Sequence, residues 1–248
     1  MQPMTEEMAL KCDLLEELVE ELETKTGTLR RPFNFESYEE ALNLMALACR
    51  QVLGVVALAR TGFHLLPPAD VAARAAYEAS VRAAWMLRPD DPMECEVRWL
   101  AHLLGEVNYL DKEIDEGTKE MGINMDEAES RRDGIARFHA GVSKQLVERG
   151  YRLKKGLPPI PEMLIEIGER KTYAIYSLLC QTAHGGHYST WIFRGTGVGT
   201  QKTHGEFITQ EKWNVPLAIS RFAFKGPAAI IFNRFRLDYS GLAKLLGP

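Results

Sequence analysis

The segment Arg74–Leu87, RAAYEASVRAAWML, carries charged side chains at a regular spacing in apolar surroundings. Arg74, Glu78 and Arg82 recur every four residues, which places them on one face of a helix. One interpretation is a solvated face with weak helical ion pairs. The other is an array in which Glu78 orients two guanidinium groups toward an anion such as phosphate. Arg60, on the preceding apolar segment, favours the second interpretation, because a charge among apolar residues needs a partner.

A second group of polar residues ends the segment Tyr173–Gly186, YAIYSLLCQTAHGG. Ser177 and His184 lie seven residues apart, so they share a helical face, with Tyr176 beside them. The glycine pair after His184 predicts a left-handed helix end, where the helix dipole favours a protonated imidazole. Three interpretations of His184 and His187 remain open: a capping histidine, an acid–base or anion-binding imidazole, and part of a zinc site.

Two other patterns are weaker. Cys180 precedes His184 by one turn, but a nucleophile–base pair usually needs a third, orienting group, so we expect a core thiol. The glycine-rich segment 195–203 has Thr200 where a phosphate-binding loop has its second glycine, and it lacks the strand-to-helix context. We expect it to form a flap that brings Arg194, Lys202 or His204 toward a site.

Composition bounds the class of protein. The chain has 248 residues, a formal charge of -4 and 46% hydrophobic residues, which is enough for a sizeable core and gives no broad basic field for nucleic acid. Its four scattered cysteines suit reduced thiols, and its acidic beginning is unlike a secretory signal. The apolar stretch Val52–Ala59 is too short to span a bilayer. We therefore predict a cytoplasmic protein without membrane contact.

Hydrophobic periodicity predicts an all-α, multi-helix bundle with a small glycine-rich flap or β-hairpin near 189–212. The predicted domains are an amphipathic N-terminal helix over 1–30 and a single helical bundle over 31–248. Pro67-Pro68 should end the second helix and Asp70 should cap the third. The predicted helices cover about 4–24, 37–66, 71–87, 93–116, 125–149, 162–183 and 215–246, with breaks inside the second near Gly54 or Gly62 and inside the last near Gly226-Pro227.

The two motifs together resemble the bacterial domain of unknown function 5677 family over about residues 70–190. Its members show an R-x-x-x-E helix ending in an aromatic residue, then a Tyr/Leu/Ser helix ending in a His-Gly or His-Pro step. The matching residues here are Arg74, Glu78, Trp85, Tyr176, Ser177 and His184. That family is distantly similar to HEPN domains, many of which are metal-independent ribonucleases of toxin and phage-defence systems. Arg132 and His139 also fit, loosely, the R-x(4–6)-H pattern of such enzymes.

The resemblance implies a site in which His184 is the acid or base and Arg74 and Arg82, oriented by Glu78, bind phosphate. The further candidates for ligand binding are Tyr176, Ser177, His187, Arg170 and Arg60. We expect no cofactor and no bound metal.

Three functions follow as hypotheses. The first is a metal-independent ribonuclease or nucleotide-processing protein of a toxin or defence system, with RNA or a nucleotide as partner. The second is a non-catalytic ligand-binding or protein-interaction module of a regulatory or defence complex. The third is a metal-dependent small-molecule enzyme. A homodimer through the terminal helices is a further expectation.

Overall fold

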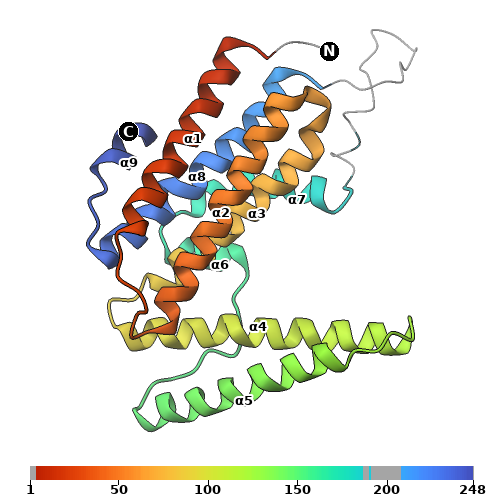
Figure 1. Cartoon of the computed structure of the whole chain (residues 1–248), viewed down its shortest axis with the longest axis vertical. Helices are drawn as coiled ribbons and strands as arrows, with labels where there is room; N and C mark the ends of the chain where they lie inside the picture. Colours follow the sequence, from red (N-terminus) through yellow and green to blue (C-terminus); the bar gives the residue numbers. More distant parts are fainter. Residues whose placement is uncertain (1–3, 187–189, 191–207, 248) are drawn as a thin grey trace. The chain divides into compact units, whose positions relative to one another are not determined.

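A computed structural model describes residues 4–186, 190 and 208–247, and these residues form α-helices, short 3-10 turns and no β-strand. The α-helices are α1 (Glu6–Gly27), α2 (Glu36–Thr61), α3 (Leu66–Leu87), α4 (Pro92–Lys119), α5 (Asp126–Glu148), α6 (Ile160–Glu166), α7 (Tyr173–Ala183), α8 (Gln210–Phe235) and α9 (Ser240–Leu246) (Figure 1). The predicted all-α class is confirmed. Most of the predicted flap or hairpin at 189–212 lies outside the described residues, and from Gln210 onward the chain belongs to α8.

The boundary between α2 and α3 differs from the prediction. α2 ends at Thr61, and α3 begins at Leu66 after the 3-10 turn Phe63–Leu65. Pro67-Pro68 therefore lies in the first turn of α3 and does not end α2. Proline is tolerated there because the first-turn N–H groups have no partner within the helix. Asp70 consequently lies inside α3 and is not its cap.

The predicted helix over 162–183 is divided by a turn at Gly168. This glycine has a φ of 82°, in the left-handed region that glycine adopts without strain. Its N–H bonds the carbonyl of Ile165 at 3.2 Å, and the next N–H bonds that of Leu164 at 2.8 Å, which closes α6. A 3-10 turn, Arg170–Thr172, then leads into α7. Because α6 ends before this turn, α7 is a separate helix that begins at Tyr173.

α8 is continuous through Gly226-Pro227, so the predicted break there is wrong. The helix ends at Phe235 and is followed by Arg236 in a left-handed conformation. Pro227 is buried together with Phe224 and Ala228. Packing on this face keeps the helix together although proline removes one backbone hydrogen bond.

Contacts group the chain into two compact units. The first comprises Met1–Pro32, Ala41–Trp85 and Ile160–Pro248, so it includes α1 and the C-terminal helices. In it α1 packs against α8 and α9 (Figure 1), using an apolar face with buried Leu15 and Leu18. The predicted division at residue 30 follows sequence order, whereas these contacts join the first helix to α8 and α9.

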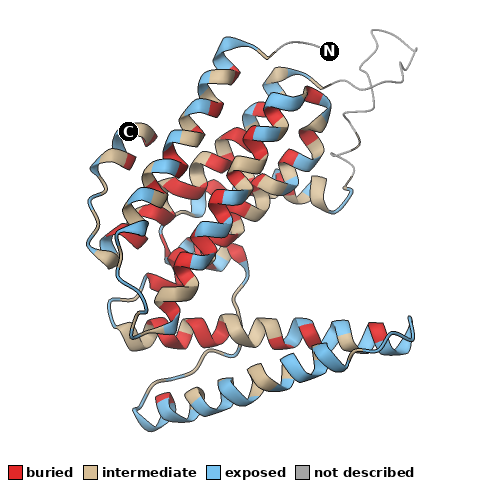
Figure 2. Cartoon of the chain, in the orientation of Figure 1, coloured by how far each residue is buried: buried red, intermediate tan, exposed pale blue. Residues whose placement is uncertain are grey.

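The second unit comprises Phe33–Glu40 and Met86–Pro159. α4 and α5 pack side by side in it, with the Trp99 and Phe138 rings edge to face at 5.7 Å. The buried carboxylate of Glu96 accepts the backbone N–H of Ser37 at 2.8 Å, at the beginning of α2. Figure 2 shows that α5 is largely exposed.

Two described helices, α2 and α8, are long and apolar enough to cross a membrane by length and composition. Of the most apolar 18-residue window of each, 50% and 56% respectively is buried inside the protein (Figure 2). Core helices of a soluble protein meet the same test. The absence of membrane contact stays a prediction.

Candidate functional site

The α3 stripe forms the predicted ion pairs. Arg74 Nε lies 2.7 Å from Glu78 Oε1, and Arg82 Nη2 lies 3.5 Å from Glu78 Oε2. The exposed fractions of the three side chains are 21% for Arg74, 34% for Arg82 and 20% for Glu78, so the stripe is half-buried. The predicted ion pairs are present and are more protected from water than a solvated face, and the binding of an anion by this array stays a prediction.

Helix α7 supplies a third donor to Glu78. The hydroxyl of Tyr176, a buried residue, donates to Glu78 Oε1 at 2.7 Å. Burial, and next the hydrogen bond to this carboxylate, raises the pKa of Tyr176 well above its usual value. Tyr176 therefore stays a neutral donor near pH 7. Groups from two helices together hold Glu78 in place, and Glu78 in turn fixes two arginines.

Partial burial opposes the charge of Arg74. The hydrogen bond and charge of Glu78 outweigh it, and the pKa of Arg74 is raised. The guanidinium is a permanent cation that can only donate. It lies beside aromatic surface as well, with its Cζ 6.0 Å from the centre of the Tyr176 ring. Arg74 is therefore a charged donor held at the contact between α3 and α7.

His184 contacts Arg74, the arginine that pairs with Glu78. It follows the last residue of α7 as the C-cap, and Gly185 with a φ of 64° turns the chain away, as the glycine pair predicted. Its Nε2 lies 3.1 Å from Arg74 Nη1. Because arginine can only donate, this hydrogen bond requires an unprotonated Nε2, with the imidazole proton on Nδ1. In this contact the imidazole therefore accepts and the guanidinium donates.

Asp70 belongs to the same stripe, although its place in the sequence predicted only a helix cap. It precedes Arg74 by four residues, and its Oδ2 accepts the hydroxyl of Thr182 on α7 at 3.0 Å. Burial is the larger influence on this carboxyl and raises its pKa to about 6, while the bond from Thr182 lowers it in part. The four-residue spacing was the available signal, but the predicted helix start placed Asp70 outside α3.

The segment from α6 to α7 runs antiparallel to α3. Partners of residues later in α3 come earlier in this segment: Asp70 pairs with Thr182, and Trp85 Nε1 donates to Glu166 Oε2 at 3.1 Å. Between these pairs, the Tyr77 hydroxyl shares a hydrogen bond with that of Thr172. This series of polar contacts aligns the two segments and brings Arg74 beside His184.

The other predicted site residues lie elsewhere. Ser177 donates to the carbonyl of Ala174 within α7 at 2.8 Å, so Tyr176 and not Ser177 contacts the stripe. Arg60 pairs with Asp13 at 2.7 Å and Glu16 at 2.6 Å on α1, and it does not join Arg74. The Cζ of Arg170 lies 4.6 Å from the centre of the Tyr173 ring. His187 and the glycine-rich segment 195–203 lie outside the described residues.

Arg132 and His139 are not brought together. Arg132 pairs with Asp111 at 2.8 Å and with Asp133 at 2.6 Å, whereas His139 Nδ1 lies 3.4 Å from the Ser143 hydroxyl. Burial lowers the pKa of His139. Arg132 therefore contacts carboxylates of α4 and α5, and His139 contacts a hydroxyl of α5. The two residues of the loose R-x(4–6)-H pattern do not contact each other among the described interactions.

Within the described ranges, no three His, Cys, Asp or Glu side chains converge as metal ligands would. His187 lies beyond these ranges, so its part in a zinc site stays a hypothesis. Cys180 is only partly buried. Among the candidate residues that are described, the group brought together is therefore one of arginines, a carboxylate, a phenol and an imidazole.

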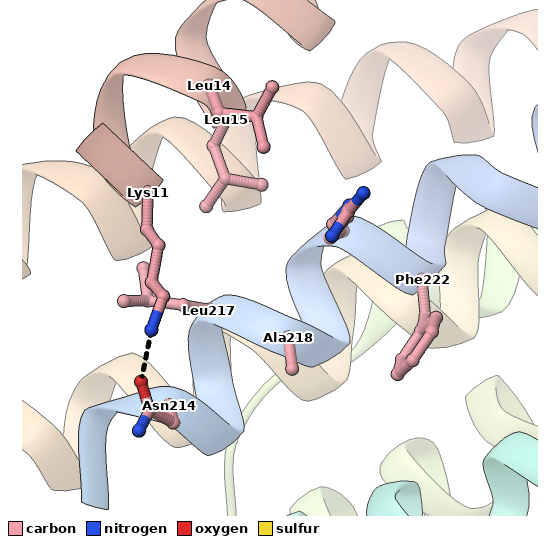
Figure 3. A pocket seen from close by; sticks show the side chains of 8 residues that line it. Lys11, Leu14, Leu15, Asn214, Leu217, Ala218 and Phe222 are labelled. Carbon is pink, nitrogen blue, oxygen red and sulfur yellow. Dashed lines mark hydrogen bonds between the residues drawn. The ribbon is translucent and has the colours of Figure 1, made fainter. Parts of the chain in front are cut away.

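A separate pocket of about 220 Å³ lies between α1 and α8 (Figure 3). Its lining residues are Lys11, Leu14, Leu15, Asn214, Leu217, Ala218, Arg221 and Phe222. Lys11 Nζ bridges the two helices by donating to Asn214 Oδ1 at 2.8 Å. Arg221 Nη2 donates to the carbonyl of Leu246, and its buried Nε has no hydrogen-bond partner among the described residues. The lining is mainly apolar, and one of its two cations, Lys11, also pairs with Glu7 at 2.6 Å.

The fold and this cluster define an all-α protein with a group of polar contacts between two antiparallel helical segments. A family model described as a family of unknown function (DUF5677) matches residues 38–196, more than half of the chain. The chain belongs to this family, as the motifs on α3 and α7 predicted. No curated protein and no solved structure matches the chain. The more distant likeness to HEPN domains stays a prediction.

Proposed function

We propose that the protein is a metal-independent ribonuclease or nucleotide-processing protein whose site is centred on His184 and Arg74. The observation that carries the proposal is the 3.1 Å contact between His184 Nε2 and Arg74 Nη1. It joins an acid–base group to a phosphate-binding group, although 110 residues separate them in sequence. A role in a toxin or defence system, and a cytoplasmic location, belong to the same proposal.

The residues support a division of tasks. Arg74 and Arg82 bind the phosphate, because paired guanidinium groups match its oxygens and its charge. Glu78, held by both arginines and by Tyr176, keeps them oriented. The exposed imidazole of His184 is open to substrate.

Cleavage of RNA at this site would start with His184 Nε2 taking the proton of a ribose 2′-hydroxyl. The 2′-oxygen attacks phosphorus, the bond to the 5′-oxygen breaks, and water supplies the proton that the leaving oxygen takes. The products are a 2′,3′-cyclic phosphate and a 5′-hydroxyl end. Arg74 must first leave His184 Nε2, because its N–H occupies the lone pair that accepts the proton. The incoming phosphate gives Arg74 a new acceptor.

The test is the cleavage of labelled single-stranded RNA by purified protein in the presence of EDTA. We expect His184→Ala to lower the initial rate by about 100-fold or more, the usual worth of an acid–base group. The matched control is His64→Ala, since His64 is also an exposed histidine in the first unit and lies outside the cluster. It should keep the wild-type rate. Equal rates for wild type and His184→Ala would overturn the proposal.

The same assay addresses the metal-dependent enzyme. A metal-independent site keeps its rate after chelation, and elemental analysis of the purified protein finds no stoichiometric metal. Loss of activity with EDTA, together with one metal ion per chain, would replace our proposal with the metal-dependent hypothesis.

The pocket between α1 and α8 favours a second candidate function, a non-catalytic ligand-binding or protein-interaction module. Its lining, in which apolar side chains predominate, is suited to an apolar molecule or an apolar face of a helix. Leu10 of α1, 62% exposed, adds apolar surface for the predicted homodimer through the terminal helices. This candidate predicts that the wild-type protein does not cleave RNA.

A further inference from the structure

Arg170 is an exposed cation held against an aromatic ring. It lies in the 3-10 turn before α7, and its Cζ lies 4.6 Å from the centre of the Tyr173 ring. Its side chain forms no ion pair or hydrogen bond with any residue that the structure describes. The guanidinium therefore lies over the Tyr173 ring, and its N–H groups are not engaged within the part of the chain that the structure describes. The sequence predicted Arg170 as a ligand-binding residue without indicating which part of a ligand it binds.

A continuous series of contacts connects this pair to the candidate site. The Tyr173 ring lies 5.9 Å from the Tyr176 ring. Tyr176 donates to Glu78, Glu78 pairs with Arg74, and Arg74 contacts His184. The Arg170–Tyr173 pair and the imidazole thus lie at opposite ends of α7, within the same compact unit.

The spacing suits a short single strand. Tyr173 and His184 are eleven residues apart, which is about 16 Å along a helix. Stacked nucleotides advance about 3.4 Å each, and extended ones advance further, so about three to five nucleotides cover this distance. An oligonucleotide of this length with a phosphate at Arg74 can therefore place a base further along the strand over Arg170.

We propose that Arg170, supported by Tyr173, is a base-stacking subsite for single-stranded nucleic acid. The inference rests on the proposed function, because it takes the phosphate to lie at Arg74. Unpaired bases stack on aromatic rings and on guanidinium planes, whereas bases inside a duplex are already stacked. The support from Tyr173 limits the motion of the arginine before binding, so that less conformational entropy is lost on contact. The subsite selects unpaired over paired strands and carries little sequence preference.

The experiment measures the binding of fluorescent 2′-O-methyl oligonucleotides, which lack the attacking hydroxyl and stay intact. A six-nucleotide probe is compared with the same backbone without bases. We expect Arg170→Ala and Arg170→Lys each to weaken binding of the base-containing probe by about 5- to 100-fold, the usual worth of one stacked base. Arg170→Lys should change binding of the abasic probe by less than about 2-fold, and Arg170→Ala should weaken the abasic probe only as much as the loss of one charge does.

Lysine keeps the charge without the plane, so Arg170→Lys separates stacking from simple attraction. Lys171→Ala is the matched control, because Lys171 is an exposed cation in the same turn. Its loss should weaken both probes equally, through charge alone. Wild-type binding by Arg170→Lys, or equal losses on both probes in Arg170→Ala, would overturn the stacking subsite.

The outcomes separate this inference from the proposed function. If RNA is cleaved through His184 but Arg170→Ala binds both probes as wild type does, the subsite is refuted and the nuclease stands. If the base-dependent effect of Arg170 is present but His184→Ala cleaves like wild type, the assigned chemistry fails and the strand-binding surface remains.

Discussion

Removing the charge of Asp70 should stabilise the protein at neutral pH. Burial raises the pKa of this carboxyl from 3.8 to about 6, only partly offset by the hydrogen bond from Thr182. A shift of about 2 units corresponds to about 3 kcal/mol of free energy, which is an upper bound for a group that remains partly exposed. Asp70→Asn keeps an oxygen that accepts the Thr182 hydroxyl and carries no charge. We expect it to raise the free energy of unfolding at pH 7 by about 1–3 kcal/mol.

The sign of the pH dependence follows from the raised pKa. Above about pH 6 the carboxyl of Asp70 is ionised in both the folded and the unfolded chain, and only the folded chain bears the cost of burying the charge. Below about pH 4 it is protonated in both states and the cost is absent. The contribution of Asp70 to stability therefore declines as pH rises from about 4 to about 6. Asp70→Asn should remove this decline.

Urea unfolding followed by circular dichroism at pH 4, 5, 6 and 7 measures the effect. Asp115→Asn is the control, since Asp115 pairs with Lys119 on the surface and its side chain is 59% exposed. That substitution should change stability by less than about 0.5 kcal/mol at each pH. If Asp70→Asn destabilises the protein at pH 7, or leaves the pH profile unchanged, then burial is not the dominant influence on Asp70 and the reasoning fails.

Two further substitutions test how the site is held. Tyr176→Phe keeps the buried ring but removes the hydroxyl that donates to Glu78. The free energy of unfolding at pH 7 should therefore fall by about 1–2 kcal/mol. An unchanged urea midpoint would contradict a stabilising role of that hydrogen bond. Gly168→Ala should cost about 1–2 kcal/mol from its φ of 82° alone, because no atom lies within 4 Å of the added Cβ. Gly134 lies within α5, and a Cβ added there is equally free of contacts, so Gly134→Ala should stabilise the protein by about 0.5–1 kcal/mol. Similar effects at both glycines would show that backbone conformation is not the cause.

Much of the fold was predictable because helical periodicity is local. The regular apolar spacing located most of the helices, and the four-residue spacing of Arg74, Glu78 and Arg82 correctly placed them on one face. The errors occurred where local signals have two meanings. Pro67-Pro68 can end one helix or begin the next, and the glycine–proline pair in α8 is overridden by packing. The left-handed turn at Gly168 interrupts a segment whose periodicity looked continuous.

The sequence by itself determined the chemistry that is present: the family, the all-α class, the arginine–glutamate stripe and the histidine at a helix end. The tertiary structure decided which of these groups meet. Tyr176 and Ser177 are adjacent, and only the packing of α7 on α3 selects Tyr176 as the donor to Glu78. Tertiary packing likewise pairs Arg60 with Asp13 of α1 and places Arg74 beside His184. The physical reason is that periodicity fixes which residues share a face of one helix, whereas the partner of that face depends on contacts between segments far apart in the chain.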